Sequence, residues 1–222
     1  MTPRHRPDSK VPDCFFLNHP DDPTMQPATT TAPLALAALV ATAPLPAQDQ
    51  PASVPPTVAD LQYAKHKSCT LDFWKAGGDG PRPLHVHIHG GGWTGGDKKS
   101  GRGQARTFLD KGISYASINY RLSGEAPLPA PVHDAAYAIQ FLRSKASAWN
   151  INPDRIALSG GSAGACTSMW ILFHDDLADP HSDDPVKRFS TRVTAAAVSG
   201  GQVSIDPHRS RSGSGTASSS TA

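Results

Sequence analysis

The sequence predicts an α/β domain with a mostly parallel sheet, on three observations. Short apolar runs of strand length alternate with stretches of helical spacing between residues 61 and 207. The runs are apolar almost throughout, as in strands that helices cover on both faces of a sheet. Glycine-rich segments at 90–92 and 160–164 each follow such a run. Because ligand sites in these sheets lie beyond the carboxyl ends of the strands, both segments are expected at one edge.

The first half of the domain is expected to hold four strands and one helix. Residues 61–65 and 69–75 are short alternating segments, which predict an early hairpin of edge strands. A strand over 83–89 follows, in which Leu, Val and Ile alternate with histidines. A helix over 100–111 and a second strong strand over 113–120 complete this half.

The second half continues the alternation of helix and strand. Residues 131–149 carry apolar side chains at helical spacing. The Asn-Pro-Asp sequence at 152–154 is expected to break this helix before a strand over 155–159. A further helix runs from Ser162 to about His174, and a last short strand covers 193–198. This order is typical of parallel strands joined by helical crossovers.

Three flanking segments differ in composition from the domain. Residues 1–24 contain several prolines and no apolar periodicity, and are interpreted as an upstream over-reading that stays disordered. Residues 48–60 are interpreted as a proline-rich linker. Residues 208–222 consist almost entirely of Ser, Gly, Thr, Ala and Arg, a low-complexity composition that cannot bury a core and is expected to be disordered.

Residues 25–47 contain no charged side chain and include an apolar run over 34–41. A helix needs about 20 residues to span a bilayer, so no stable membrane anchor is expected from this run. It fits the core of a secretory signal peptide that starts at Met25 and is cut after Ala47. This interpretation predicts a secreted or periplasmic protein. The alternative, a Pro/Ala linker, would leave the protein in the cytoplasm.

Charge, cysteines and histidines limit the partners and cofactors. The formal net charge is +2 and no basic stripe is present, so nucleic acid is not an expected partner. The three cysteines make no disulfide framework, and Cys69 and Cys166 are expected to pack as small apolar groups. His85, His87 and His89 share one strand face, but no carboxylate or cysteine cluster accompanies them. Neither a metal nor a cofactor is expected.

The segment Gly160-Gly161-Ser162-Ala163-Gly164 carries the clearest chemical signal. It stands between an apolar strand and a helix-compatible stretch, the context of a G-x-S-x-G turn that exposes a serine nucleophile. Glycine at 160 and 164 is expected because strand and helix approach so closely that Cβ atoms there would collide. A serine hydroxyl needs an adjacent base, so Ser162 is a candidate catalytic nucleophile that requires a partner.

The segment 89–93, which reads H-G-G-G-W, follows another strand and predicts an oxyanion pocket. The expected donors to a developing oxyanion are the backbone N–H groups of Gly90, Gly91 and Ala163. His89 and Gly92 are expected to support the loop, His89 through hydrogen bonds to the glycine backbone. Phosphate binding is the alternative for a glycine-rich turn, but the chain has neither a P-loop nor a dinucleotide fingerprint.

These segments resemble the α/β-hydrolase fold and, more narrowly, the carboxylesterases with a His-Gly-Gly-Gly loop, the hormone-sensitive-lipase-like and feruloyl-esterase-like group. The similarity runs from about 61 to 206 and includes Leu71-Asp72-Phe73, the run 87–93 with Gly96-Asp97-Lys98, the run 118–122, Asp134, and the runs 152–156 and 160–164. The resemblance implies a serine carboxylic-ester hydrolase that acts through an acyl-enzyme, without a cofactor, on short-chain or plant-wall esters. It implies Ser162 as the nucleophile, followed along the chain by an acid and a histidine.

The sequence departs from this family pattern after Gln202, where further strands and helices are expected but a Ser/Gly/Arg-rich run appears. The interpretation is a chain truncated by a frameshift or premature stop near Pro207, with the C-terminal strands and helices missing. The acid and the histidine of the triad are not found. Asp206 is a candidate acid, but His208 is too close to it in sequence to reach both that carboxylate and Ser162. The activity of this chain is therefore expected to be impaired.

Two other functions stay open. One is a non-catalytic hydrolase-like protein that binds an acyl or carbohydrate ligand in the same cleft, and the other is an aminopeptidase of the same fold. Asp134 is expected to cap or pair structurally at a helix start, and His174 and His181 are expected to be solvated. The sequence determines neither the ester nor the oligomeric state.

Overall fold

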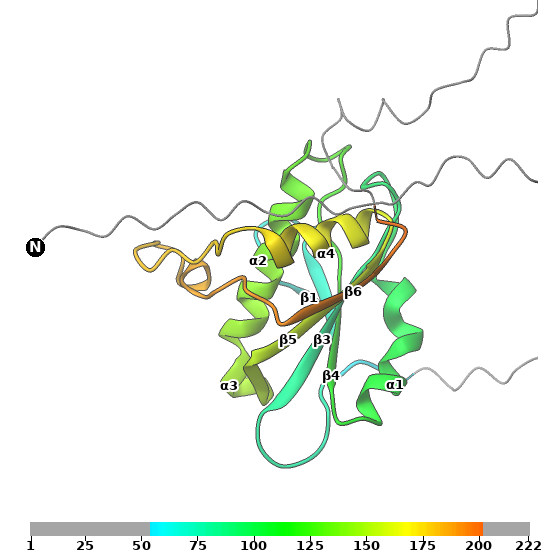
Figure 1. Ribbon diagram of the computed structural model, residues 1–222, viewed down its shortest axis with the longest axis vertical. Coiled ribbons are helices and arrows are strands. Elements are labelled where there is room, and N and C mark those ends of the chain that lie inside the picture. The colour runs from blue at the N-terminus through cyan, green and yellow to red at the C-terminus, as the bar shows by residue number, and fades with distance from the viewer. Residues whose placement is uncertain (1–53, 202–222) are drawn as a thin grey trace, which may run out of the picture. The chain divides into compact units, whose positions relative to one another are not determined.

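The computed structural model describes residues 54–201, whose strands form a six-stranded sheet in the order β1-β2-β4-β3-β5-β6 (Figure 1). The pairs β1–β2 and β2–β4 are antiparallel, whereas β3 pairs in parallel with β4 and β5, and β5 with β6. The mostly parallel sheet predicted from the sequence is thus confirmed. The strands are β1 (Val58–Gln62), β2 (Thr70–Trp74), β3 (Arg82–Ile88), β4 (Ser114–Ile118), β5 (Ile151–Gly161) and β6 (Ala195–Ser199).

Helices cover both faces of the sheet, as predicted. Figure 1 shows α1 on one side and α2, α3 and α4 on the other. The helices are η1 (Lys98–Gln104, a 3₁₀ helix), α1 (Ala105–Leu109), α2 (Ala130–Ser144), α3 (Ala146–Trp149), α4 (Ala163–Phe173) and η2 (Pro185–Arg188, a 3₁₀ helix). No helix within residues 54–201 is long and apolar enough to cross a membrane.

Successive side chains of β3 point to opposite faces of the sheet, and the two faces have different compositions there. Leu84, Val86 and Ile88 are fully buried in the main core, together with residues of α2 and α4. The intervening His85 faces α1, where its ring stacks on Phe108 with centroids 4.0 Å apart. At β3 the sheet is therefore covered on both faces, with aliphatic side chains toward the main core and His85 toward α1.

Several predicted boundaries need correction. β1 begins at Val58, inside the segment 48–60 that was expected to be a linker. β2 is not an edge strand, because it lies between β1 and β4. The helix expected over 100–111 is a 3₁₀ helix followed by five α-helical residues; Gly101 and Gly103 lie in the 3₁₀ part, where glycine disfavours a regular α-helix.

The Asn-Pro-Asp sequence at 152–154 lies inside β5 instead of ending the helix before it. The helix expected over 131–149 is divided into α2 and the short α3, and it is followed by Asn150, which adopts a left-handed conformation with φ of 57°. Pro153 is tolerated in the strand because the pairing is interrupted there: Arg82 pairs with Ile151, and the next recorded pair joins Leu84 to Ile156. The proline therefore costs no regular ladder hydrogen bond.

A bulge interrupts the edge strand β1 at Asp60, whose φ is 51°. The Asp60 N–H donates to Oδ1 of Asp72 at 2.9 Å, and Nζ of the buried Lys98 bonds both carboxylates. Arg102 completes the group at 2.8 Å from Asp72 Oδ2. Burial alone would raise the pKa of the Asp72 carboxyl, but the hydrogen bonds from Asp60, Lys98 and Arg102 outweigh it and lower that pKa.

The predictions for residues 1–53 and 202–222 fall outside the described residues. They include the upstream segment, the signal peptide, the candidate acid Asp206 and the low-complexity tail.

Candidate active site

Ser162 is the single residue between β5 and α4, and its backbone conformation makes the sharp turn between the two. Its φ and ψ are 52° and −120°, a conformation that a residue with a side chain rarely adopts. The residue is solvent-exposed, and its N–H donates to the carbonyl of Ser199, the last residue of β6, at 2.9 Å. The strand, sharp turn and helix predicted for a G-x-S-x-G nucleophile are therefore present.

The glycines on either side of Ser162 are required by close backbone packing. A Cβ on Gly160 would lie 2.4 Å from the carbonyl carbon of Gly164. A Cβ on Gly164 would lie 2.0 Å from the carbonyl oxygen of Ile88, at the end of β3. Both distances are far below van der Waals contact and involve backbone atoms that side-chain rotation cannot relieve. The predicted reason for these two glycines is confirmed.

The glycine loop after β3 meets this turn because Ile88 and Gly160 are partners in the parallel pairing of β3 and β5. A Cβ on Gly90 would lie 2.6 Å from Gly161 O and 3.5 Å from the Ser162 Cβ, so the loop backbone borders the serine. Gly91 has a φ of 106°, and its carbonyl accepts hydrogen bonds from the N–H groups of Thr94 and Gly95. The structure thus brings the two predicted segments together at one edge of the sheet.

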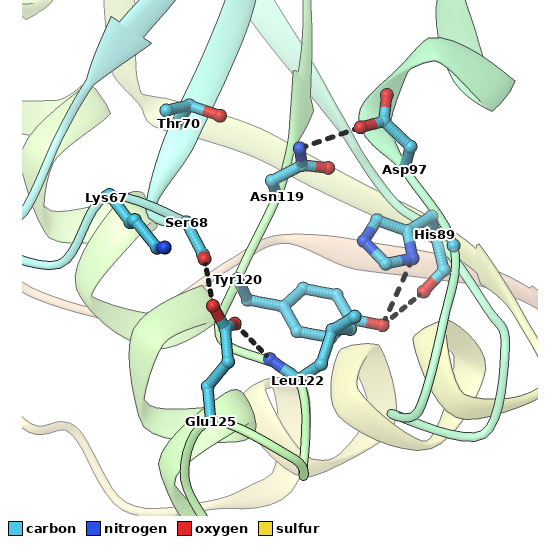
Figure 2. A pocket seen from close by; sticks show the side chains of 10 residues that line it. Lys67, Ser68, Thr70, His89, Asp97, Asn119, Tyr120, Leu122 and Glu125 are labelled. Atoms are coloured by element: carbon cyan, nitrogen blue, oxygen red, sulfur yellow. Dashed lines mark hydrogen bonds between the residues drawn. The ribbon is translucent and has the colours of Figure 1, made fainter.

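The His89 ring contacts the backbone of this loop. Figure 2 shows its ring beside Tyr120, which follows β4; the two rings stack with centroids 4.3 Å apart. The His89 Nδ1 lies 2.7 Å from the carbonyl oxygen of Gly90. Burial lowers the pKa of His89, which keeps the ring neutral at physiological pH. Sequence reasoning missed the role of Tyr120; its only signal was an aromatic residue at the end of the neighbouring strand.

Gly92 and Trp93 extend the loop with two successive residues at positive φ, 60° and 57°. The Trp93 indole is nearly buried, and its Nε1–H donates to Thr167 Oγ1 on α4 at 3.1 Å. This bond ties the far end of the loop to the helix that begins after Ser162.

A polar pocket of about 250 Å³ borders the loop on the side of β2 and β4 (Figure 2). Hydrogen bonds between neighbouring side chains order its wall: Asn119 Nδ2 donates to Asp97, and Ser68 Oγ donates to Glu125 at 2.6 Å. The residues that line it are Lys67, Ser68, Thr70, His89, Gly96, Asp97, Asn119, Tyr120, Leu122 and Glu125.

Comparison with known proteins identifies the family. The profile of the BD-FAE family matches residues 71–198, more than half of the chain. The chain belongs to the BD-FAE family. The resemblance to α/β-hydrolase carboxylesterases that the sequence predicted is therefore confirmed, and so is the fold class.

Curated relatives of this BD-FAE chain include two proteins of Mycobacterium tuberculosis. Carboxylic ester hydrolase LipN is 42% identical over 100 residues, which are 44% of this chain and 27% of LipN. Probable carboxylic ester hydrolase LipM is 31% identical over 145 residues, 62% of this chain and 32% of LipM. The chain thus spans about a third or less of the length of these relatives.

Two solved structures have the same fold. The acetyl ester-xyloside bifunctional hydrolase of Caldicellulosiruptor lactoaceticus is 30% identical with a TM-score of 0.55, over 59% of this chain and 47% of that one. The propionate-bound thermophilic esterase Est2 of Thermogutta terrifontis is 26% identical with a TM-score of 0.56, over 67% and 55%.

A second serine of this BD-FAE chain, Ser159, contacts two histidines on the α1 face of the sheet. Its Oγ lies 2.7 Å from His85 Nε2 and 3.4 Å from His87 Nδ1. Burial, and then the charge of His87, lower the pKa of His85 to about 4. Within residues 54–201 no group of three His, Cys, Asp or Glu side chains is arranged to hold a metal ion.

The remaining candidates lie away from the serine turn. Asp134 receives hydrogen bonds from the Arg121 guanidinium at 2.6 and 2.7 Å, which confirms its structural role. His174 and His181 are exposed, as predicted, although the His174 ring also stacks on Trp170. In the part of the chain that the structure describes, no hydrogen bond joins the Ser162 hydroxyl to a histidine.

Proposed function

We propose that this chain is a serine carboxylic-ester hydrolase with Ser162 as its nucleophile. The observation that carries the proposal is the exposed Ser162 at positive φ, bordered by the backbone of Gly90. In the reaction, Ser162 Oγ attacks the ester carbonyl while a general base takes its proton, and the alcohol leaves with a proton as the acyl-enzyme forms. Water then attacks the acyl-enzyme, which releases the acid and restores the serine hydroxyl. The N–H groups of Gly90, Gly91 and Ala163 are the proposed donors to the oxyanion of each tetrahedral intermediate.

The position of Ser162 at the start of α4 favours this chemistry. The N–H groups of the first helical turn lack partners within the helix, and the helix dipole stabilises negative charge at that end. The proposed substrates are small esters with short acyl chains. Two relatives support this choice: one is named an acetyl ester-xyloside hydrolase, and the esterase Est2 was solved with propionate. Plant-wall acyl esters are the finer proposal.

The test is hydrolysis of p-nitrophenyl acetate and butyrate by the full chain and by Ser162→Ala. We expect slow but saturable turnover by the wild type, because no acid and no histidine of a triad were found in the sequence, and a clear further loss in the variant. Ser159→Ala is the matched control, since it removes a serine hydroxyl three positions away that borders no glycine loop, and it should keep the activity.

Other outcomes identify the alternative functions. Saturable binding of an ester without turnover would favour a non-catalytic binding protein. Faster cleavage of alanine p-nitroanilide than of the esters would favour an aminopeptidase. Equal turnover by the wild type and by Ser162→Ala would contradict the proposed nucleophile.

We also propose that the protein is exported through residues 25–47, because this segment combines an apolar run with a complete lack of charge. N-terminal sequencing of protein recovered outside the cytoplasm should begin at Gln48. Recovery of uncleaved chain in the cytoplasm alone would contradict export.

A further inference from the structure

Two hydrogen bonds hold consecutive carbonyl groups of the glycine loop. Tyr120 Oη donates to the His89 carbonyl oxygen at 2.8 Å (Figure 2). The His89 Nδ1 must carry a proton, because its partner at 2.7 Å, the Gly90 carbonyl, can only accept. The Tyr120 hydroxyl has a single proton, which it donates to the His89 carbonyl. In its contact of 3.3 Å with His89 Nδ1, the Tyr120 oxygen can therefore only accept from the Nδ1–H group.

Because peptide units are planar, these two hydrogen bonds also determine the directions of the N–H groups of Gly90 and Gly91. A trans peptide unit is planar, and its C=O and N–H point in opposite directions. The His89 carbonyl shares a unit with the Gly90 N–H, and the Gly90 carbonyl shares one with the Gly91 N–H. Holding the two carbonyls therefore fixes the directions of the two N–H groups that are proposed as oxyanion donors.

Tight packing around the same two carbonyls preserves the arrangement. A Cβ on Gly96 would lie 2.4 Å from both Gly90 O and His89 Nδ1, and a Cβ on Gly164 would lie 2.7 Å from His89 O. Tyr120 itself is only 2% exposed, and its ring is within 13° of parallel to that of His89. The buried, stacked ring thus holds the Tyr120 hydroxyl in one position, where it donates to the His89 carbonyl oxygen.

We propose that Tyr120 is a positioning residue for ester hydrolysis, which orients the N–H groups of Gly90 and Gly91 through the carbonyls of His89 and Gly90. The inference rests on the proposed function. Oxyanion donors act most strongly on the charge that develops in the transition state. Loss of the Tyr120 hydroxyl therefore lowers kcat and leaves KM nearly unchanged.

The experiment compares Tyr120→Phe with Tyr115→Phe in the full chain. Each change removes one buried tyrosine hydroxyl that donates to a backbone carbonyl; that of Tyr115 bonds Gly101 at 2.9 Å, in the apolar cluster beneath α1. In Tyr120→Phe alone we expect kcat for p-nitrophenyl acetate to fall ~10-fold, less than the 10²–10³-fold that follows complete loss of a donor. Amide hydrogen exchange across residues 89–96 should become faster in that variant alone.

The possible results separate the two proposals. Unchanged exchange across 89–96, or unchanged kcat beside an active wild type, would overturn the role of Tyr120 and leave the proposed function standing. Equal losses of kcat in both tyrosine variants would also overturn it, since general destabilisation would then explain them. A wild type without turnover dependent on Ser162 would refute the proposed function, and the positioning role would fall with it.

Discussion

Ser159 and Ser162 lie three positions apart, yet they stand in opposite environments. Ser159 is inside β5, paired with His87 of β3 on one side and Ala197 of β6 on the other, and its hydroxyl lies 2.7 Å from a histidine nitrogen. Ser162 has left the sheet, adopts a positive φ and borders the glycine loop. Ser159 thus has a histidine within hydrogen-bond distance, whereas Ser162 has an exposed turn beside the glycine loop.

The difference teaches that a hydrogen bond between serine and histidine does not define a nucleophile. In a central strand the backbone N–H groups are used by the ladder, so none is available to an oxyanion beside Ser159. His85 is also a poor base, because burial lowers its pKa to about 4, whereas an effective general base titrates near the operating pH. Ser162, in contrast, is exposed on a strained turn that the backbone of the glycine loop borders.

The largest expected effect comes from Gly164→Ala, which would break the serine turn. The new Cβ would lie 2.0 Å from the Ile88 carbonyl oxygen, and both atoms belong to rigid packed elements. We expect a loss of at least about 3 kcal/mol in the free energy of unfolding, as in severe overpacking, and loss of ester hydrolysis. Urea denaturation and the p-nitrophenyl acetate assay measure the two effects.

Gly103→Ala is the matched control for this prediction, because nothing lies within 4 Å of a Cβ at that position. It should change the free energy of unfolding by less than about 1 kcal/mol, in either direction. Similar behaviour of the two alanine variants would show that close packing is not the reason for Gly164.

The next effect is a dependence of stability on pH that originates at His85. Its folded-state pKa of about 4 lies below the ordinary value, so between that pKa and about pH 6.5 only the unfolded chain binds this proton. The free energy of unfolding should therefore fall as the pH is lowered through this range, by up to about 3 kcal/mol from His85 alone. Denaturation in urea at several pH values measures the slope.

His85→Asn should reduce that slope, and a slope that this substitution leaves unchanged would contradict its origin at His85. Titration of the His85 ring by NMR gives a direct readout. A pKa near 7 for His85 would make the Ser159–His85 pair a competent nucleophile and base. That result would contradict the conclusion that Ser162, and not Ser159, is the better candidate nucleophile.

Ser159→Ala is expected to have the smallest effect. It removes the partner of His85 Nε2 and should cost about 1 kcal/mol of stability, the net value of a hydrogen bond between neutral groups. Ester hydrolysis should stay within about twofold of the wild type, measured as kcat at 25 °C. A loss comparable to that of Ser162→Ala would mean that the two serines act together.

Sequence reasoning reached the fold class and the serine turn because both depend on local patterns. The apolar runs over 84–88 and 156–158 predicted the central strands, and glycines at 160 and 164 predicted the close packing that the backbone distances now show. The loop support by His89 was also predicted, and the structure adds its partner, the Gly90 carbonyl.

Features that depend on distant residues escaped prediction. Pro153 reads as a strand breaker, and only the interrupted pairing between β3 and β5 shows why a strand can contain it. Tyr120 and His89 are separated by 31 residues, so no spacing rule connects them. The cluster of Lys98, Asp72 and Arg102 was likewise invisible, since each residue taken alone reads as a surface charge.

The bulge at Asp60 has a consequence for how molecules of this protein meet each other. An edge strand offers unpaired N–H and C=O groups on which the strand of another molecule can add. At β1, the Asp60 N–H is turned inward and donates to Asp72. The extra residue of the bulge also shifts the register, so the N–H and C=O groups on either side of it cannot all pair with one regular strand. Lys98 also bonds the exposed Asp60 carboxylate, so within the described residues this edge of the sheet is poorly suited to the addition of another strand.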